Sequence, residues 1–215
     1  MATVSTVRKA SQRPKKESKS DLTRKRIIDA AAKIFAQKGY SGARLADIAA
    51  EAKTRAGGIY YYFSSREELV EEVLARSTMF TVQAVNERID QLPKGASVVD
   101  QIRAAIRGQI SAILAEEGYA TAYLKIYSQV PDEIKAKHRR ILREFFNLWR
   151  RLIAAGKESG ELRQDIDPAI MRLVIVGSIQ WSVEWADAGT SSSDELADKI
   201  ADIFLGGICS GANPN

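Results

Sequence analysis

Residues 44–63 read RLADIAAEAKTRAGGIYYYF, and this stretch decides the fold. Apolar residues recur at steps of three and four on both sides of a polar centre, at Ile48, Ala49 and Ala52 and then at Ile59, Tyr62 and Phe63. Each half therefore predicts a short helix with one apolar face. The small Ala49 lies where two crossing helices must approach closely. Two short helices joined by a tight turn are typical of a helix-turn-helix, whose second helix enters the DNA major groove.

The flanking sequence extends this pattern in both directions. AGGIYYYF at 56–63 is followed by SSREEL at 64–69, and it is preceded by IIDAA at 27–31 and IFAQKGY at 34–40. Over residues 24–75 the chain thereby resembles the TetR family of bacterial transcription regulators. The resemblance implies an all-α fold, with an N-terminal three-helix helix-turn-helix domain that binds DNA. A C-terminal helical domain that binds a ligand and dimerises is implied to follow.

Two residues depart from the family pattern. Lys53 stands where the turn usually has glycine, and a non-glycine residue in a left-handed turn costs about 1 kcal/mol. Arg55 stands where a serine or threonine usually caps the second helix, so Thr54 is the candidate cap one residue earlier. These departures weaken the predicted turn without excluding it.

The resemblance also implies which residues meet DNA. The family uses the positions that are occupied here by Arg55, Ala56, Gly57, Tyr60, Tyr61, Tyr62 and Arg66. The last two of these touch phosphate, and the others face the groove. Gly57 and Gly58 have no side chains, so the backbone can approach DNA closely there. Arg44 and Arg66 lie near predicted helix starts, which favour phosphate. The alternative role is the core, for Phe63 fully and for Tyr62 in part.

Positive charge is concentrated around this motif. Residues 1–63 hold 14 Lys and Arg against 5 Asp and Glu, whereas residues 64–215 hold 18 against 22. The first part therefore carries a net charge of +9 and the second −4, as a nucleic-acid footprint requires. Residues 1–20 are polar and basic, and we expect a disordered arm that either follows the phosphates or is only a solubilising tail.

The rest of the chain predicts two further regions. Residues 21–68 form the DNA-binding domain, and residues 69–210 form a helical domain for ligand binding and dimerisation. Gly156 and Gly160 predict a loop before Asp167-Pro168, which is a strong helix start. The segments at about 168–187 and 194–208 predict two apolar helices, the first of them apolar nearly all round. Because such a helix needs cover on more than one side, we expect a homodimer through these two helices. Alternatively, they only fill the core of one chain.

A ligand site is predicted between the C-terminal helices. The candidates are large side chains at helical spacing, several with a polar group: Tyr123, Tyr127, Phe145, Trp149, Trp181 and Trp185. Pockets between helices are typically lined in this way, although aromatic residues on a helix more often belong to the core. QWSVEW at 180–185 and LGGI at 205–208 look like family members that control lipid, steroid or acyl-coenzyme A catabolism. That resemblance implies a small hydrophobic effector, with an acyl-coenzyme A thioester as the candidate.

Other chemistry finds little support in the sequence. One Cys and one His exclude a disulfide within the chain and any site that needs two His ligands. We expect no cofactor, no metal and no enzyme activity. The N-terminus lacks an apolar run and the longest apolar stretch is too short for a bilayer, so we expect a cytoplasmic protein with no membrane contact. The first hypothesis is a homodimeric, ligand-responsive repressor that binds a double-stranded operator. The alternative is an architectural DNA-binding protein with weak sequence preference and no effector.

Overall fold

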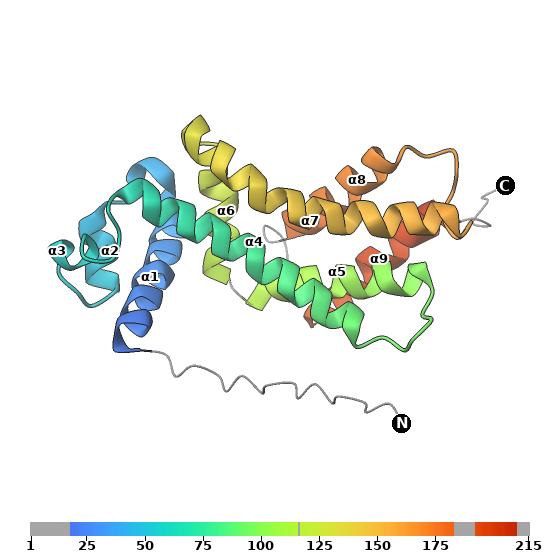
Figure 1. Cartoon of the computed structure of the whole chain (residues 1–215), viewed down its shortest axis with the longest axis horizontal. Helices are drawn as coiled ribbons and strands as arrows, with labels where there is room; N and C mark the ends of the chain where they lie inside the picture. The colour runs from blue at the N-terminus through green and yellow to red at the C-terminus, as the bar shows by residue number, and fades with distance from the viewer. Residues whose placement is uncertain (1–17, 116, 183–191, 210–215) are drawn as a thin grey trace, which may run out of the picture.

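The computed structural model describes residues 18–115, 117–182 and 192–209. Regular structure in these ranges is helical, apart from an isolated bridge between Leu162 and Cys209, and this confirms the predicted all-α fold. The helices are α1 (Lys19–Gly42), α2 (Leu45–Glu51), α3 (Ala56–Ile59), α4 (Arg66–Asp90), α5 (Val98–Ala115), α6 (Glu117–Tyr127), α7 (Asp132–Glu158), α8 (Pro168–Trp181) and α9 (Ser193–Ile208). Figure 1 shows α1 to α3 at one end of an elongated molecule and α8 and α9 near the other.

Helix α1 begins earlier than the sequence suggested. The Ser18 hydroxyl accepts a hydrogen bond from the Asp21 backbone N–H, and the Asp21 carboxylate accepts one from the Ser18 backbone N–H. This capping box satisfies free N–H groups at the helix start. The expectation of disorder up to residue 20 was therefore wrong for Lys19 and Ser20, and residues 1–17 lie outside the described ranges. Near the other end, Gly39 leaves the helical conformation at φ 68°.

The turn of the helix-turn-helix takes the left-handed backbone conformation, although its residue there is a lysine, for which this conformation costs free energy. Lys53 has φ 51°, as expected for a residue at the usual glycine position. The predicted cap at Thr54 was wrong, since Arg55 occupies the N-cap of α3 and no side chain caps that end. Helix α3 has only four residues, so packing rather than local hydrogen bonding holds it in place. Ile59 and Phe63 supply that packing, each 1% exposed.

Two long helices run along the molecule. Helix α4 has 25 residues and spans about 38 Å, and the Ser65 side chain caps its start. Helix α7 has 27 residues and continues to Glu158, so the loop predicted at Gly156 was wrong. A Cβ at Gly156 would lie 2.6 Å from the Leu162 side chain. Gly156 is therefore needed for close packing inside the helix, whereas Gly160 makes the turn at φ 77°.

The buried side chains form two separate cores. The N-terminal core combines α1, α2 and α3 with the first turns of α4 and with α6, and its largest fully buried side chains include Phe35, Phe63 and Ile27. The C-terminal core combines α5, most of α7, α8 and α9 around Trp149. Because α6 residues such as Ile126 belong to the N-terminal core, packing does not follow the division expected near residue 68.

Charged pairs align α9 with its neighbours. The guanidinium of Arg107 on α5 donates two hydrogen bonds to Asp198 on α9, at 2.6 and 2.9 Å. Arg103 pairs with Asp202 at 2.7 Å, one helical turn further along each helix. Because the numbering rises on α5 as it falls on α9, the two helices run antiparallel. This ladder lies at the surface, where each pair contributes about 0–1 kcal/mol.

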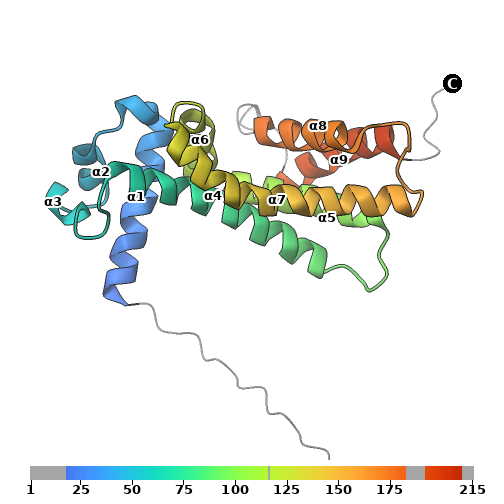
Figure 2. The same cartoon turned by 45° about the horizontal axis from the view of Figure 1, so that its top comes forward.

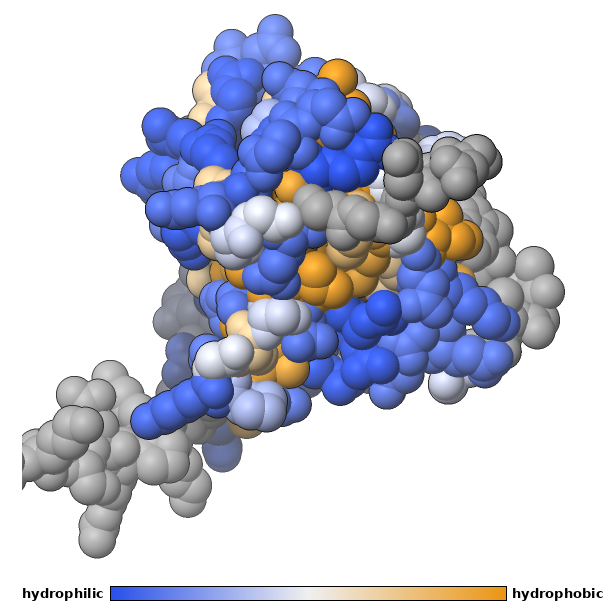
Figure 3. All heavy atoms as spheres, turned by 90° about the vertical axis from the view of Figure 1, so that its right-hand side faces the viewer, coloured by the Kyte–Doolittle hydropathy of each residue, from blue (hydrophilic) through white to orange (hydrophobic). Residues whose placement is uncertain are grey.

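Among the described residues, α8 and α9 expose several apolar side chains at the C-terminal end. We call them the apolar face, and they are Ile170, Leu173, Val174, Trp181 and Ile203. Seen from the end opposite the helix-turn-helix, hydrophobic residues gather at the centre of the surface between hydrophilic ones (Figure 3). Among the described helices, none is long and apolar enough to cross a membrane.

Candidate functional site: a nucleic-acid interface and an effector cavity

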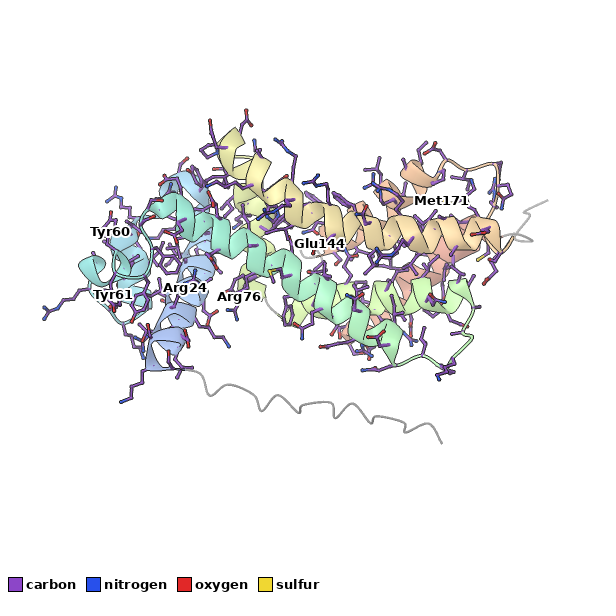
Figure 4. All side chains as sticks on the ribbon, in the orientation of Figure 1. Arg24, Tyr60, Tyr61, Arg76, Glu144 and Met171 are labelled. Atoms are coloured by element: carbon purple, nitrogen blue, oxygen red, sulfur yellow. The ribbon has the colours of Figure 1, made fainter. Side chains whose placement is uncertain are left out.

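The tip of the helix-turn-helix presents two tyrosines to solvent. Tyr60 is 58% exposed and Tyr61 is 81% exposed, although both follow directly after the buried Ile59. Figure 4 shows both at the end of the molecule that α1 to α3 form. Tyr60 caps the C-terminal end of α3 and Tyr61 follows in the turn, so both extend the exposed surface of the reader helix. Exposed tyrosines can contact thymine methyl groups with their rings and phosphates with their hydroxyls.

Small and basic residues complete this exposed surface. Arg44, Arg55, Ala56 and Gly57 are all exposed, and a Cβ at Gly57 would meet no atom within 4 Å. Gly58 differs, because a Cβ there would lie 2.8 Å from the Thr54 hydroxyl. The absence of a side chain at Gly58 therefore serves the packing of the turn, whereas Gly57 leaves room for DNA to approach.

The two residues predicted to touch phosphate are partly engaged within the domain. The Arg66 guanidinium donates a hydrogen bond to the Tyr40 carbonyl, and its Cζ lies 4.3 Å from the centre of the Tyr40 ring. Tyr62 is half-buried against the N-terminal core and meets the Tyr61 ring edge-on at 5.0 Å. Arg66 therefore holds the start of α4 to α1, whereas Tyr62 packs between Tyr61 and the N-terminal core.

A cavity of about 250 Å³ lies between five helices of the C-terminal half. Helices α4, α5, α6, α7 and α8 all contribute to its wall, which is mostly apolar and aromatic and includes Phe80, Ile113, Tyr119, Tyr123, Leu142, Phe145, Phe146 and Val176. Among the described residues, Arg172 is the one charged side chain in the wall, and its Cζ lies 4.8 Å from the centre of the Phe146 ring. Apolar walls with a few polar groups are typical of sites for small hydrophobic ligands.

The six predicted ligand residues lie in different places. Tyr123 and Phe145 line the cavity, and Tyr127 stacks on Tyr123 with ring centres 5.0 Å apart. Trp149 is fully buried in the C-terminal core, whereas Trp181 is 62% exposed on the apolar face. Trp185 lies outside the described residues. The structure therefore brings Tyr123, Tyr127 and Phe145 together and places the two described tryptophans elsewhere.

Tyr119 was not among these predicted residues, yet it lies at the centre of the arrangement. Its side chain lines the cavity, and its hydroxyl donates a hydrogen bond of 2.7 Å to the Asp29 carboxylate on α1. Arg76 on α4 lies over the Tyr119 ring at 5.2 Å and approaches Asp29 at 3.8 Å. The only signal in the sequence was its spacing of four residues from Tyr123, because the partners on α1 and α4 are distant in the chain.

A buried histidine lies beside the same cavity. The His138 Nε2 is 3.2 Å from the Thr78 hydroxyl, and its ring lies 5.6 and 5.7 Å from those of Tyr123 and Tyr127. Burial disfavours the charged imidazolium and lowers the pKa of His138 to about 4. Burial likewise raises the pKa of the Tyr123 hydroxyl above its usual value. Both groups are therefore neutral near pH 7, and this side of the cavity suits an uncharged part of a ligand.

Comparison with known proteins covers both halves of the chain. The family described as "Bacterial regulatory proteins, tetR family" matches residues 27–73, and "Tetracyclin repressor-like, C-terminal domain" matches residues 95–208. A curated relative is the HTH-type transcriptional repressor KstR2 of Rhodococcus jostii. It is 26% identical over 192 residues, which is 88% of this chain and 93% of the relative.

Two solved structures share the fold over nearly their whole length. The regulator FadR of Bacillus subtilis in complex with stearoyl-CoA has a TM-score of 0.72 at 23% identity, covering 86% of this chain and 98% of that one. AibR in complex with isovaleryl coenzyme A and operator DNA has a TM-score of 0.72 at 19% identity, covering 86% and 96%. Together with the two family matches, of which the second alone spans more than half the chain, these findings show that the protein belongs to the TetR family of DNA-binding transcriptional regulators.

Proposed function

We propose that the protein is a homodimeric transcriptional repressor that a hydrophobic acyl thioester releases from its operator. The exposed tip formed by Arg55, Gly57, Tyr60 and Tyr61 reads the operator. The cavity around Tyr123 and Phe145 holds the acyl chain of the effector. Solved relatives that carry stearoyl-CoA and isovaleryl coenzyme A support this class of effector.

One observation carries the proposal, namely that a single side chain joins the cavity to the DNA-binding domain. Tyr119 forms part of the cavity wall and holds α1 through Asp29, at 2.7 Å. Helix α1 in turn packs against α2 and against α4. A ligand that displaces the Tyr119 ring must therefore move or break a contact to the helix that supports the reader. If the effector and the operator favour different positions of the Tyr119–Asp29 contact, the binding of one weakens the binding of the other.

The apolar face of α8 and α9 supports the homodimer. Ile170, Val174 and Trp181 of α8 are 55%, 55% and 62% exposed, and steps of four and seven residues place them on one side of the helix, outside the cavity wall. Exposed apolar residues gathered on one face mark interaction sites. A two-fold dimer also explains the short reader helix, because it places two readers about 34–36 Å apart on one DNA face.

Gel-shift titration tests this function directly. Purified protein is titrated onto DNA from the region upstream of its own reading frame and onto a scrambled control at two salt concentrations. We expect a preference of about a thousandfold or more for the first DNA. We also expect isovaleryl-, decanoyl- or stearoyl-CoA to weaken this binding. Equal binding to both DNAs with a steep fall in salt would instead favour the architectural alternative. Operator binding that none of the three thioesters changes would contradict the proposed effector class.

A further inference from the structure

The outer face of α7 carries five exposed arginines. They lie within four turns of the helix, and we name them the arginine strip: Arg139, Arg140, Arg143, Arg150 and Arg151. Steps of four and seven residues place Arg139, Arg143 and Arg150 in one row, because such steps return to the same side of a helix. In the part of the chain that the structure describes, no arginine of the strip forms an ion pair with a carboxylate. Arg150 donates only to the neutral Asn147 amide, at 2.6 Å.

This row runs beside the wall of the effector cavity. Leu142 and Phe146 of α7 line the cavity. Arg139 precedes Leu142 by three residues, Arg143 precedes Phe146 by three, and Arg150 follows Phe146 by four, so each arginine is a helical neighbour of a wall residue. The guanidinium of Arg172 on α8 also lies over the face of the Phe146 ring. A molecule that leaves the cavity past Phe146 therefore meets positive charge on two helices.

The carboxylates in the groove beside the strip already have partners. Arg143 also borders a groove between α4 and α7 that Glu68, Glu71 and Glu72 line. Glu71 pairs with Lys137 at 2.6 Å and Glu72 with Arg24 at 2.7 Å. Glu68 accepts hydrogen bonds from the Ser64 backbone N–H and hydroxyl. The positive charge of the strip is therefore left for a group from outside the chain.

Glu144 is the one exposed acid within the strip's length, and it lies toward the other side of the helix. It borders a groove that Arg24 and Arg76 also line, between α1, α4 and α7. Figure 4 shows Glu144 midway along α7, with Arg24 and Arg76 on the α1 and α4 side. Among the described residues, Glu144 forms no ion pair with Arg139, Arg143 or Arg150, and it lies on the side of α7 that borders α4.

We propose that Arg139, Arg143 and Arg150 bind the phosphate groups of the effector while its acyl chain occupies the cavity. This inference rests on the proposed function and adds the residues that recognise the phosphate groups of the effector, which a free fatty acid lacks. Arginine suits this task, because its planar guanidinium binds phosphate oxygens through two parallel hydrogen bonds and keeps its charge at every relevant pH. The buried cavity supplies affinity for the chain, and the exposed row distinguishes coenzyme A thioesters from acids with the same chain.

The test measures binding by isothermal titration calorimetry with matched ligands and matched variants. The ligands share one acyl chain, taken from the tightest binder among isovaleryl-, decanoyl- and stearoyl-CoA. They are the coenzyme A thioester, the pantetheine thioester that lacks phosphate, and the free acid. The variants are R139Q/R143Q/R150Q and the control R140Q/R151Q. The control removes charge from the other row of the same strip.

We expect the triple variant to bind the coenzyme A thioester about tenfold or more weakly than the unchanged protein. We expect the control to lose less than threefold in the same affinity. Both variants should bind the pantetheine thioester with the affinity of the unchanged protein. Exposed ion pairs are individually weak, so three substitutions are needed for a clear loss. Equal losses in both variants would overturn the inference, because they would report general attraction to a basic surface. A direct loss of operator affinity in the triple variant, without effector, would overturn it in favour of a nucleic-acid contact.

The same titrations separate the two proposals. The unchanged protein could bind the pantetheine thioester and the coenzyme A thioester with equal affinity. This result would overturn the phosphate site and leave the proposed cavity site in place. Binding of neither thioester to the unchanged protein would overturn both. Circular dichroism spectra of the variants show whether they fold, and glutamine at exposed helix positions is expected to preserve the helix.

Discussion

The two hydrophobic cores of this molecule differ in how completely one chain covers them. At the N-terminal end, the apolar faces of α1, α2 and α3 are closed by α4, α6 and the start of α7, and most exposed surface is polar. At the C-terminal end, α8 and α9 bury one side around Met171 and Phe204 and leave Leu173, Trp181 and Ile203 on the surface. The difference shows that α4 and α6 close the core of the DNA-reading end, whereas no described residue covers these apolar side chains of α8 and α9. Figure 2 shows α8 and α9 at that end of the long helices, far from α1 to α3.

Removing the centre of the C-terminal core should have the largest effect. Trp149 is fully buried there, so Trp149→Ala leaves a cavity and should reduce the free energy of unfolding by about 3–5 kcal/mol. Urea denaturation followed by circular dichroism measures the loss. Tyr61→Ala is the control, because this aromatic residue at the other end is 81% exposed and should change stability by less than about 0.5 kcal/mol. Similar losses in the two variants would contradict the assigned burial.

At the N-terminal end the largest effect should appear in binding and not in stability. Tyr60 is 58% exposed next to the buried Ile59, so Tyr60→Ala removes reading surface and leaves the core intact. We expect operator affinity to fall by about 1–3 kcal/mol with an unchanged unfolding midpoint. Fluorescence anisotropy with operator and scrambled DNA measures both affinities. Unchanged operator affinity would remove Tyr60 from the reading surface, and an equal loss on both DNAs would make it a phosphate contact.

His138 lies where the two cores meet, and its titration tests that junction. Its folded pKa of about 4 lies below the usual value of 6.5, so the unfolded chain takes up a proton that the folded chain does not. His138 therefore leaves the free energy of unfolding unchanged above about pH 6.5, and it lowers this free energy as the pH falls below that value. We expect a loss of about 1 kcal/mol between pH 7 and pH 5.5. The measurement compares urea unfolding of the natural chain and His138→Gln at both pH values. A pH dependence that His138→Gln leaves unchanged would show that the carboxylates account for it.

The smallest effect concerns communication between the two ends. Tyr119→Phe keeps the ring in the cavity wall and removes the hydrogen bond to Asp29. We expect effector affinity to stay within about twofold, while the effector-induced change in operator affinity falls by about two- to fivefold. Tyr127→Phe is the matched control, because Tyr127 lies on the same helix and does not line the cavity. A Tyr119→Phe variant with full coupling would show that the signal travels by another contact.

Local signals were enough for the buried faces of the helix-turn-helix and for the start of α8, whereas the DNA-facing residues were predicted from the resemblance to the TetR family. The three- and four-residue spacing of Ile48, Ala52 and Ile59 depends only on neighbours in the chain, and the structure buries all three. Asp167 caps α8 as predicted, because its side chain accepts from the Ala169 and Ile170 backbone N–H groups. The left-handed turn at Lys53 followed from the resemblance to the TetR family, which usually has glycine at this position.

The residues that line the cavity could not be predicted from the spacing of apolar residues along the chain. Trp149 and Trp181 read alike in the sequence, yet one is fully buried and the other is 62% exposed, because burial depends on which helix packs against each face. Tyr119 finds Asp29 across a separation of 90 residues. Gly156 was read as a helix breaker, although the Leu162 side chain fills the space where its Cβ would lie. Tertiary contacts decide all three cases.

The ion pairs between α5 and α9 are evenly spaced along both helices, and evenly spaced pairs do not fix how far one helix is shifted along the other. Arg103 and Arg107 are one turn apart, as are Asp198 and Asp202, so sliding α9 by one turn would set Asp198 against Arg103 and Asp194 against Arg107. Charge therefore selects which faces meet and in which direction the helices run. The unequal sizes of Ala197, Ala201 and Phe204, all buried in the C-terminal core, must select the position along the axis. Interchanging a small and a large residue in that row would permit slippage that no charge reversal produces.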